Sequence, residues 1–160
     1  MKHTLSVLLR NQPGALSRVT GLFSGRCFNI ESLCVAETYD PQVSCLTVVT
    51  EGEASIIEQI TKQLHKLIDV IKVNDVIEGD FVEREMALIR VKAEAGTRAE
   101  VLRIIDIFRG KVVDVSPNSY ALEITGSESK IKAVIDILRP IGIKEIIRTG
   151  KIAMSRAPKK

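Results

Sequence analysis

Two small uncharged amides, Asn11 and Asn29, flank the first stretch of helical periodicity in the chain. Asn11 opens the segment "NQPGAL", in which a strand-like run gives way to a helix. Backbone N–H groups at a helix start are unpaired and carry partial positive charge, so they hold a carboxylate without any Lys or Arg. Gly14 has no Cβ, which lets a ligand approach this backbone, and an asparagine oxygen accepts a hydrogen bond from an ammonium group. These residue types therefore fit the recognition of a free α-amino acid.

Ordinary helix capping explains the same residues. Asn11 or Gln12 is a suitable N-cap, Pro13 suits the first helical turn, and Asn29 suits the start of a turn. A strand, a Pro-Gly turn and a helix are not a specific motif. The spacing alone therefore favours capping over a ligand site.

The rest of the sequence carries no catalytic constellation. We find no Ser-His-Asp grouping, no Gly-x-Ser-x-Gly, no phosphate loop and no metal-ligand pair, and His3 and His65 are isolated. Cys27, Cys34 and Cys45 fit neither a zinc spacing nor a disulfide framework, which indicates reduced thiols. The N-terminal apolar run is too short for a signal peptide, and no run reaches membrane-spanning length. We therefore expect a cytoplasmic binding or regulatory protein with no catalytic residue, metal site or cofactor of its own.

The elements that must position Asn11 and Asn29 follow the order β-α-β-β-α-β. Leu5, Val7 and Leu9 alternate with other residues in a strand pattern, and a Pro41 turn joins two later β-rich runs. Two helices on one face of a four-stranded antiparallel sheet form the ferredoxin-like arrangement. The predicted strands are 4–10, 29–39, 43–50 and 70–77, and the predicted helices are 13–23 and 54–67.

A second cycle repeats this order after a charged segment. Its hairpin turn is Pro117-Asn118, and Gly110 is the expected C-cap of its first helix. The predicted strands are 86–93, 111–116, 120–125 and 143–150, and the predicted helices are 98–110 and 128–139, the last ending before Pro140. The fold class is therefore α+β, with two tandem ferredoxin-like domains. We place the first domain at 1–78, a linker at 79–84, and the second domain with a basic tail at 85–160.

Charge divides unevenly between the two halves. Residues 1–80 carry seven Lys and Arg against ten Asp and Glu, whereas residues 81–160 carry sixteen against ten. The basic half permits a nucleic-acid-binding regulator as an alternative function. Aromatic residues are only 4% of the chain, however, and a stacking platform for bases needs them. A stand-alone small enzyme is a second alternative, which the missing nucleophile and base oppose.

Four long segments carry the clearest functional signal. They are "LSVLLRNQPGALSRVTGLFSGRCFNIESLCVA", "EQITKQLHKLIDVIKV", "VEREMALIRV" and "IFRGKVVDVSPNSYALEITG". They closely resemble the regulatory small subunit of acetohydroxyacid synthase, also called acetolactate synthase, over nearly the whole chain. The first domain resembles an ACT domain, an amino-acid-sensing module, and the second resembles the C-terminal ferredoxin-like domain of the same subunit.

The resemblance implies a regulatory partner of a separate catalytic large subunit. That subunit is expected to hold thiamine diphosphate, magnesium and FAD, and the small subunit to activate it and confer valine feedback inhibition in branched-chain amino acid biosynthesis. The family places the effector where two ACT domains meet in a homodimer, and implies neither nucleic-acid nor membrane binding. The effector-binding role then transfers to Asn11, Gly14 and Asn29, with Ala15, Leu16 and Ile30 as neighbours.

Overall fold

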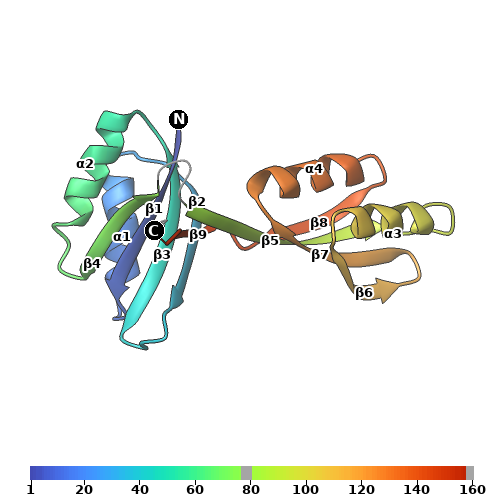
Figure 1. Ribbon diagram of the computed structural model, residues 1–160, viewed down its shortest axis with the longest axis horizontal. Helices are drawn as coiled ribbons and strands as arrows, with labels where there is room; N and C mark the ends of the chain where they lie inside the picture. Colours follow the sequence, from blue (N-terminus) through green and yellow to red (C-terminus); the bar gives the residue numbers. More distant parts are fainter. Residues whose placement is uncertain (77–80, 158–160) are drawn as a thin grey trace. The chain divides into compact units, whose positions relative to one another are not determined.

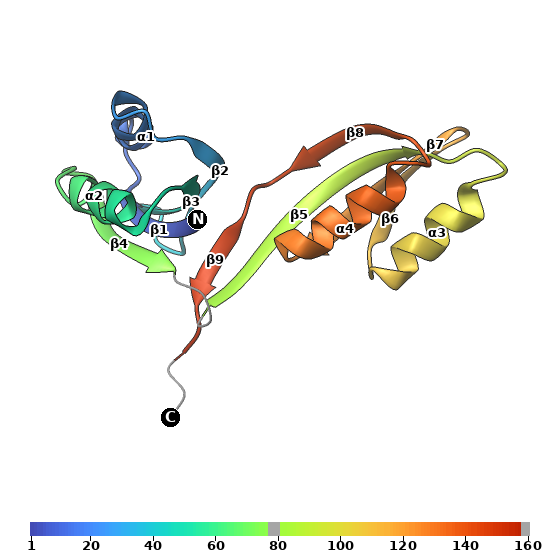
Figure 2. The same ribbon diagram turned by 90° about the horizontal axis from the view of Figure 1, so that it is seen from above.

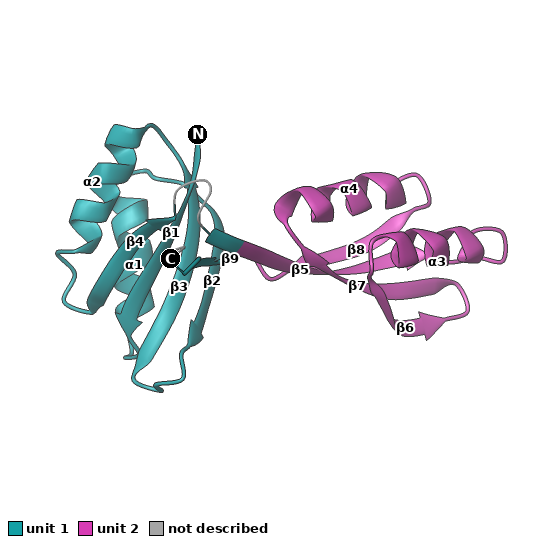
Figure 3. Ribbon diagram, in the orientation of Figure 1, with its two compact units in different colours: residues 1–82, 151–160 teal, residues 83–150 magenta. Residues whose placement is uncertain are grey.

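The computed structural model describes residues 1–76 and 81–157, and the chain forms two compact units (Figure 1). The first unit comprises residues 1–82 and 151–160, and the second comprises residues 83–150 (Figure 3). Within the described residues, no helix is long and apolar enough to cross a membrane.

The first unit is built on an antiparallel sheet with strand order β2-β3-β1-β4. The predicted order of elements is confirmed, and β2 is an edge strand. The elements are β1 (Lys2–Arg10), α1 (Ala15–Gly25), β2 (Ile30–Glu37), β3 (Val43–Glu51), α2 (Ala54–Leu64) and β4 (Val70–Val76).

Alternation along β1 decides which face of this sheet the helices cover. Leu5, Val7 and Leu9 are all buried, and they share one core with residues of both helices. Because alternate residues of a strand point to the same face, α1 and α2 pack on one side of the sheet. The helices contribute Val19, Leu22 and Phe23 from α1 and Ile57, Ile60 and Leu64 from α2.

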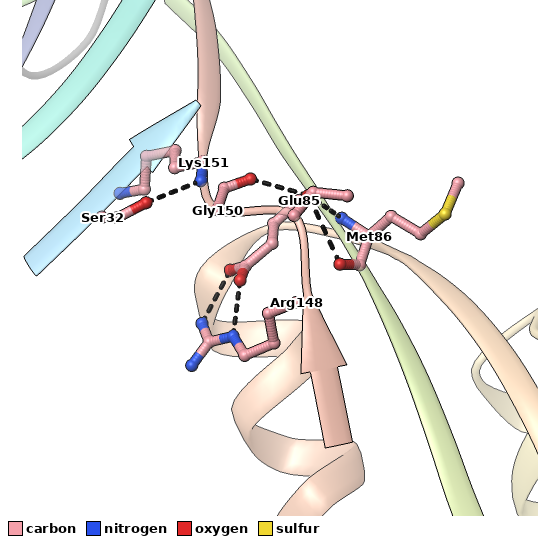
Figure 4. Close-up of polar contacts among 7 residues, drawn as sticks. Ser32, Glu85, Met86, Arg148, Gly150 and Lys151 are labelled. Carbon is pink, nitrogen blue, oxygen red and sulfur yellow. Dashed lines mark hydrogen bonds and ion pairs between the residues drawn. The ribbon is translucent and has the colours of Figure 1, made fainter. Parts of the chain in front are cut away.

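The end of the chain returns to the first unit. Strand β9 (Ile152–Ser155) contacts β1 and β4, and the Lys151 N–H donates a hydrogen bond of 3.0 Å to Ser32 Oγ (Figure 4). Residues 151–157 therefore group with the first unit, whereas the sequence placed them in a second domain at 85–160. The predicted basic tail, residues 155–160, begins at the last residue of β9, and its residues 158–160 lie outside the described residues.

The predicted linker at 79–84 overlaps a strand. Residues 79 and 80 lie outside the described residues, and residues 81–84 are the first part of β5 (Phe81–Lys92). Of this strand, residues 81–82 belong to the first unit and the remainder to the second.

The second unit repeats the architecture of the first. Its sheet has the order β6-β7-β5-β8, with β9 also paired to β5, and Figure 2 shows both of its helices on one side of that sheet. Ala87, Ile89 and Val91 of β5 are buried against the helices. The predicted α+β class with two ferredoxin-like units is thus confirmed. The remaining elements are α3 (Arg98–Ile107), β6 (Lys111–Ser116), β7 (Ser119–Gly126), α4 (Glu128–Leu138) and β8 (Ile143–Arg148).

Two details of the second unit go beyond the sequence pattern. The predicted C-cap at Gly110 is wrong, because α3 is capped by Phe108 and it is Arg109 that adopts the left-handed backbone, with φ +53°. Glu85 is buried in the sheet and accepts hydrogen bonds from Arg148 at 2.5 and 2.7 Å (Figure 4). This contact raises the pKa of the Arg148 guanidinium.

Candidate ligand-binding site

The connection between β1 and α1 is held on two sides by backbone hydrogen bonds. The Arg10 N–H donates to the Asp69 carbonyl oxygen at 2.8 Å, and the Asn11 N–H donates to the Gln42 carbonyl oxygen at 2.7 Å. The Asn11 side chain adds a bond of 2.8 Å from Nδ2 to the Pro41 carbonyl oxygen. The loop is therefore fixed between the segment that precedes β4 and the turn between β2 and β3.

Helix α1 begins without a side-chain cap. Its N-cap is Gly14, with φ +85° and ψ −11°, and this position makes no side-chain cap hydrogen bond. The capping role considered for Asn11 or Gln12 is therefore wrong, because the Asn11 amide bonds to Pro41 instead. Pro13 lies before the helix and not in its first turn. A left-handed backbone favours glycine, so the conformation at this position explains Gly14.

A pocket of about 360 Å³ opens beside this loop. Asn11, Ala15 and Leu16, three of the six predicted site residues, line it. Leu16 keeps 36% of its surface exposed, although its spacing matches the buried residues of α1. Sequence reasoning missed the other lining residues, which are Leu9, Arg10, Gln12, Val35, Ala36, Glu37 and Ser44.

The missed residues come from the strands beside the loop. Leu9 and Arg10 end β1, and the strand register places Leu9 opposite Ser44. The last residues of β2 are adjacent through β3, since Glu37 pairs with Ser44. In the sequence, only Arg10 gave a signal, because it ends the apolar alternation of the first strand. The other lining residues are brought to the pocket by strand register, which the sequence does not show.

Asn29 and Ile30 lie at the opposite end of the same sheet. Ile30 pairs with Thr50 of β3, and the Thr50 hydroxyl donates a bond of 2.6 Å to the Asn29 carbonyl oxygen. Thr50 in turn pairs with His3 at the start of β1. A single chain therefore does not bring Asn29 and Asn11 together.

One ion pair lies directly behind the loop. Arg18 donates from Nε and Nη2 to the Asp69 carboxylate, at 2.6 Å in each case. The Asp69 side chain is 5% exposed, whereas that of Arg18 is 48% exposed. A Cβ added to Gly14 would lie 3.0 Å from Arg18 Nη1, so this guanidinium stands against the glycine.

The site contains groups for binding and none for metal chemistry. Across residues 1–76 and 81–157, no cluster of His, Cys, Asp and Glu could hold a metal ion. Cys27, Cys34 and Cys45 are free thiols, as the sequence predicted. The lining combines apolar side chains with two amides, a hydroxyl, a cation and an anion, which suits a small zwitterion.

Two family models match this chain, one over each unit. "AHAS small subunit-like ACT domain" matches residues 5–72, and "Small subunit of acetolactate synthase" matches residues 84–157. The chain is 51% identical to the probable acetolactate synthase small subunit of Archaeoglobus fulgidus over 160 residues, covering 100% of both chains. The chain belongs to the acetolactate synthase small subunit family. The resemblance drawn from the sequence is thereby confirmed, including the ACT domain.

Further relatives of this family agree over the same length. The acetolactate synthase small subunit of Haemophilus influenzae is 50% identical, covering 99% of this chain and 98% of the relative. The crystal structure of the acetolactate synthase small subunit from Thermotoga maritima is 41% identical with a TM-score of 0.92, covering 99% of both chains. The regulatory small-subunit identity and the tandem fold therefore rest on full-length similarity.

Proposed function

We propose that this small subunit binds the catalytic large subunit of acetolactate synthase, raises its activity and makes it sensitive to valine. The pocket beside Asn11 carries the proposal, because it combines an apolar lining with donors and acceptors at a rigid loop. Valine is an end product of branched-chain amino acid biosynthesis, so its binding to the small subunit would provide feedback control.

The lining suits both ends of a free amino acid. Leu16 and Val35 offer apolar surface for a branched side chain. Arg10 and Glu37 carry opposite charges, and one N–H of the Asn11 amide is already bonded to the chain, which orients its oxygen as an acceptor. A zwitterion is therefore a better match than a purely apolar or purely anionic ligand.

Two copies of the chain are needed to unite the predicted residues. Strand β2 is an edge strand, and its end contributes Val35 and Glu37 to the pocket. Antiparallel pairing of two β2 strands about a two-fold axis sets the start of one strand beside the end of the other. In such a homodimer, Asn29 and Ile30 of the second copy approach the pocket that holds Asn11.

Under this proposal the chain takes no catalytic step. Thiamine diphosphate, magnesium and FAD belong to the large subunit, and the small subunit acts on it through protein contacts. The chain alone should therefore form no acetolactate from pyruvate.

Reconstitution with the large subunit tests the proposal. Acetolactate formation is measured with each protein alone and with both, across a valine titration and a parallel leucine titration. We expect activation by this chain, inhibition by valine, and a several-fold rise in the half-inhibiting valine concentration for Asn11→Ala, because one hydrogen-bonding partner of the ligand is worth about 0.5–1.5 kcal/mol. Acetolactate from the purified chain alone, or a complex that ignores valine, would overturn it.

A further inference from the structure

We propose that Asp69 and Arg18 are positioning residues that hold the effector loop, residues 11–14, in its ligand-ready conformation. This inference rests on the proposed function and deepens it, because neither residue lines the pocket. Both act on the loop from behind, through contacts with Arg10 and Gly14.

Asp69 fixes the loop at both of its ends. Its carbonyl oxygen accepts from the Arg10 N–H at 2.8 Å, directly before the loop. Its carboxylate accepts from Arg18 Nε at 2.6 Å, one helical turn after the loop. One residue therefore ties the end of β1 to the first turn of α1, and the distance that the loop spans is set by Asp69.

The Arg18 guanidinium also lies against Gly14. Its Nη1 stands 3.0 Å from the place of a Cβ on Gly14, which has φ +85°. With its guanidinium held by Asp69, Arg18 closes the space behind the loop and leaves the pocket side open. The pair therefore favours the loop conformation that places the Asn11 side chain at the pocket.

Asp69 is buried and depends on its contact with Arg18. Its side chain is 5% exposed, and a charge so deeply buried is stable only with a partner in close contact. The second unit lacks the device at the matching place. There Gly142 takes the place of Asp69, because its carbonyl oxygen accepts from the Lys92 N–H at 2.8 Å at the end of β5. Gly142 has no side chain, so it cannot bond to helix α3 as Asp69 bonds to α1.

The second unit offers a matched control in Glu85. Like Asp69 it is a buried carboxylate held by a half-exposed arginine, with side-chain exposures of 4% for Glu85 and 45% for Arg148. Glu85 lies near the start of β5, whereas the loop of that unit follows the end of the strand. Loss of its charge should lower stability without acting on the effector loop.

The test compares Asp69→Asn, Arg18→Gln and the double variant with Glu85→Gln in the complex with the large subunit. For each variant we measure activation, the half-inhibiting valine concentration, and thermal melting with and without valine. We expect Asp69→Asn and Arg18→Gln to raise the half-inhibiting concentration by roughly tenfold each, since each removes a charge-assisted hydrogen bond. The double variant should show less than the product of the two effects, because both changes remove the same contact.

Glu85→Gln should lower the melting temperature and leave the half-inhibiting concentration unchanged. If Asp69→Asn does not fold, Arg18→Lys replaces it in the comparison, because position 18 is half-exposed and lysine keeps the positive charge. Arg18→Lys should be more sensitive to valine than Arg18→Gln. An unchanged valine response in Arg18→Gln, or an equal shift in Glu85→Gln, would overturn the positioning role alone. Absence of valine inhibition in the unaltered complex would overturn the proposed function and this inference together.

Discussion

The loop after β1 and the loop after β5 are built by the same hydrogen bonds with different side chains. In the first unit the Asn11 N–H donates to Gln42, and in the second the Ala93 N–H donates to the Asn118 carbonyl oxygen at 3.0 Å. In each unit the carbonyl oxygen of the turn proline, Pro41 or Pro117, accepts a hydrogen bond from a side chain. Asn11 supplies that contact in the first unit and a helix residue, Arg98, in the second.

Under the proposed function, this difference bears on which unit binds the effector. Arg98 also donates from Nε to the Ala93 carbonyl oxygen at 3.0 Å, so its guanidinium occupies the space between loop and turn. Asn11 is shorter and reaches Pro41 from the loop itself, which leaves the pocket beside Leu16 open. We infer that the side chain bridging this loop and turn decides whether the fold keeps space for a ligand there.

The largest expected effect comes from making the first unit resemble the second. Leu16→Arg introduces a guanidinium into the pocket while its partly exposed position and equal helix propensity preserve α1. We expect the half-inhibiting valine concentration in the complex to rise by at least about tenfold, because the pocket is filled and a cation is added. Leu102→Arg, on the exposed side of α3, is the matched control and should leave the valine titration unchanged; equal responses of the two variants would contradict the account.

A smaller effect is expected from opening the second unit. Arg98→Ala removes the donor that bridges Ala93 and Pro117. The hydrogen bonds are partly exposed, so we expect a loss of about 1–2 kcal/mol in the free energy of unfolding, measured by urea titration. The valine response of the complex should not change. A shift in valine sensitivity of the size seen for Leu16→Arg would show that the second unit takes part in effector binding.

The smallest effect is expected at an ion pair outside both loops. Glu58 and Lys62 form an exposed pair on α2 at 2.6 Å, and contact with Lys62 lowers the pKa of the Glu58 carboxyl. A carboxyl with a lowered folded pKa stabilises the protein above its unfolded pKa and loses that contribution as the pH falls through the lowered value. Glu58→Gln should therefore lower the melting temperature slightly at neutral pH and not at all in strong acid. A constant difference at every pH would contradict this assignment.

The local patterns of the sequence predicted the elements well. Leu5, Val7 and Leu9 identified the buried face of β1, and the turns at Pro41 and Pro117 identified both hairpins. These features follow from side-chain periodicity and turn chemistry, which act over a few residues. The order β-α-β-β-α-β was therefore readable from the sequence twice.

The features that the sequence did not predict depend on distant partners. The role of the Asn11 amide is set by Pro41, 30 residues away, and that of Ser32 by Lys151, 119 residues away. Strand β9 is only four residues long, so its pattern gave no signal. The pocket residues of β2 could not be predicted, because pairing with β3 sets their position. The left-handed backbone of Gly14 could not be predicted either, because it depends on the hydrogen bonds that hold the loop on both sides.

The central claim is that two copies of the chain share each effector site. Its most direct test uses the variants Asn11→Ala and Asn29→Ala. Each is first assayed by itself with the large subunit, and the two are then co-expressed so that mixed dimers form. Each variant alone should respond only weakly to valine. In a mixed dimer one site carries both changes and the other is intact. Random pairing makes about half of the dimers mixed, so about one site in four is intact. Inhibition at low valine concentration should therefore return in part. If the mixture is as insensitive as the separate variants, or if Asn29→Ala alone keeps the full valine response, the shared site is contradicted.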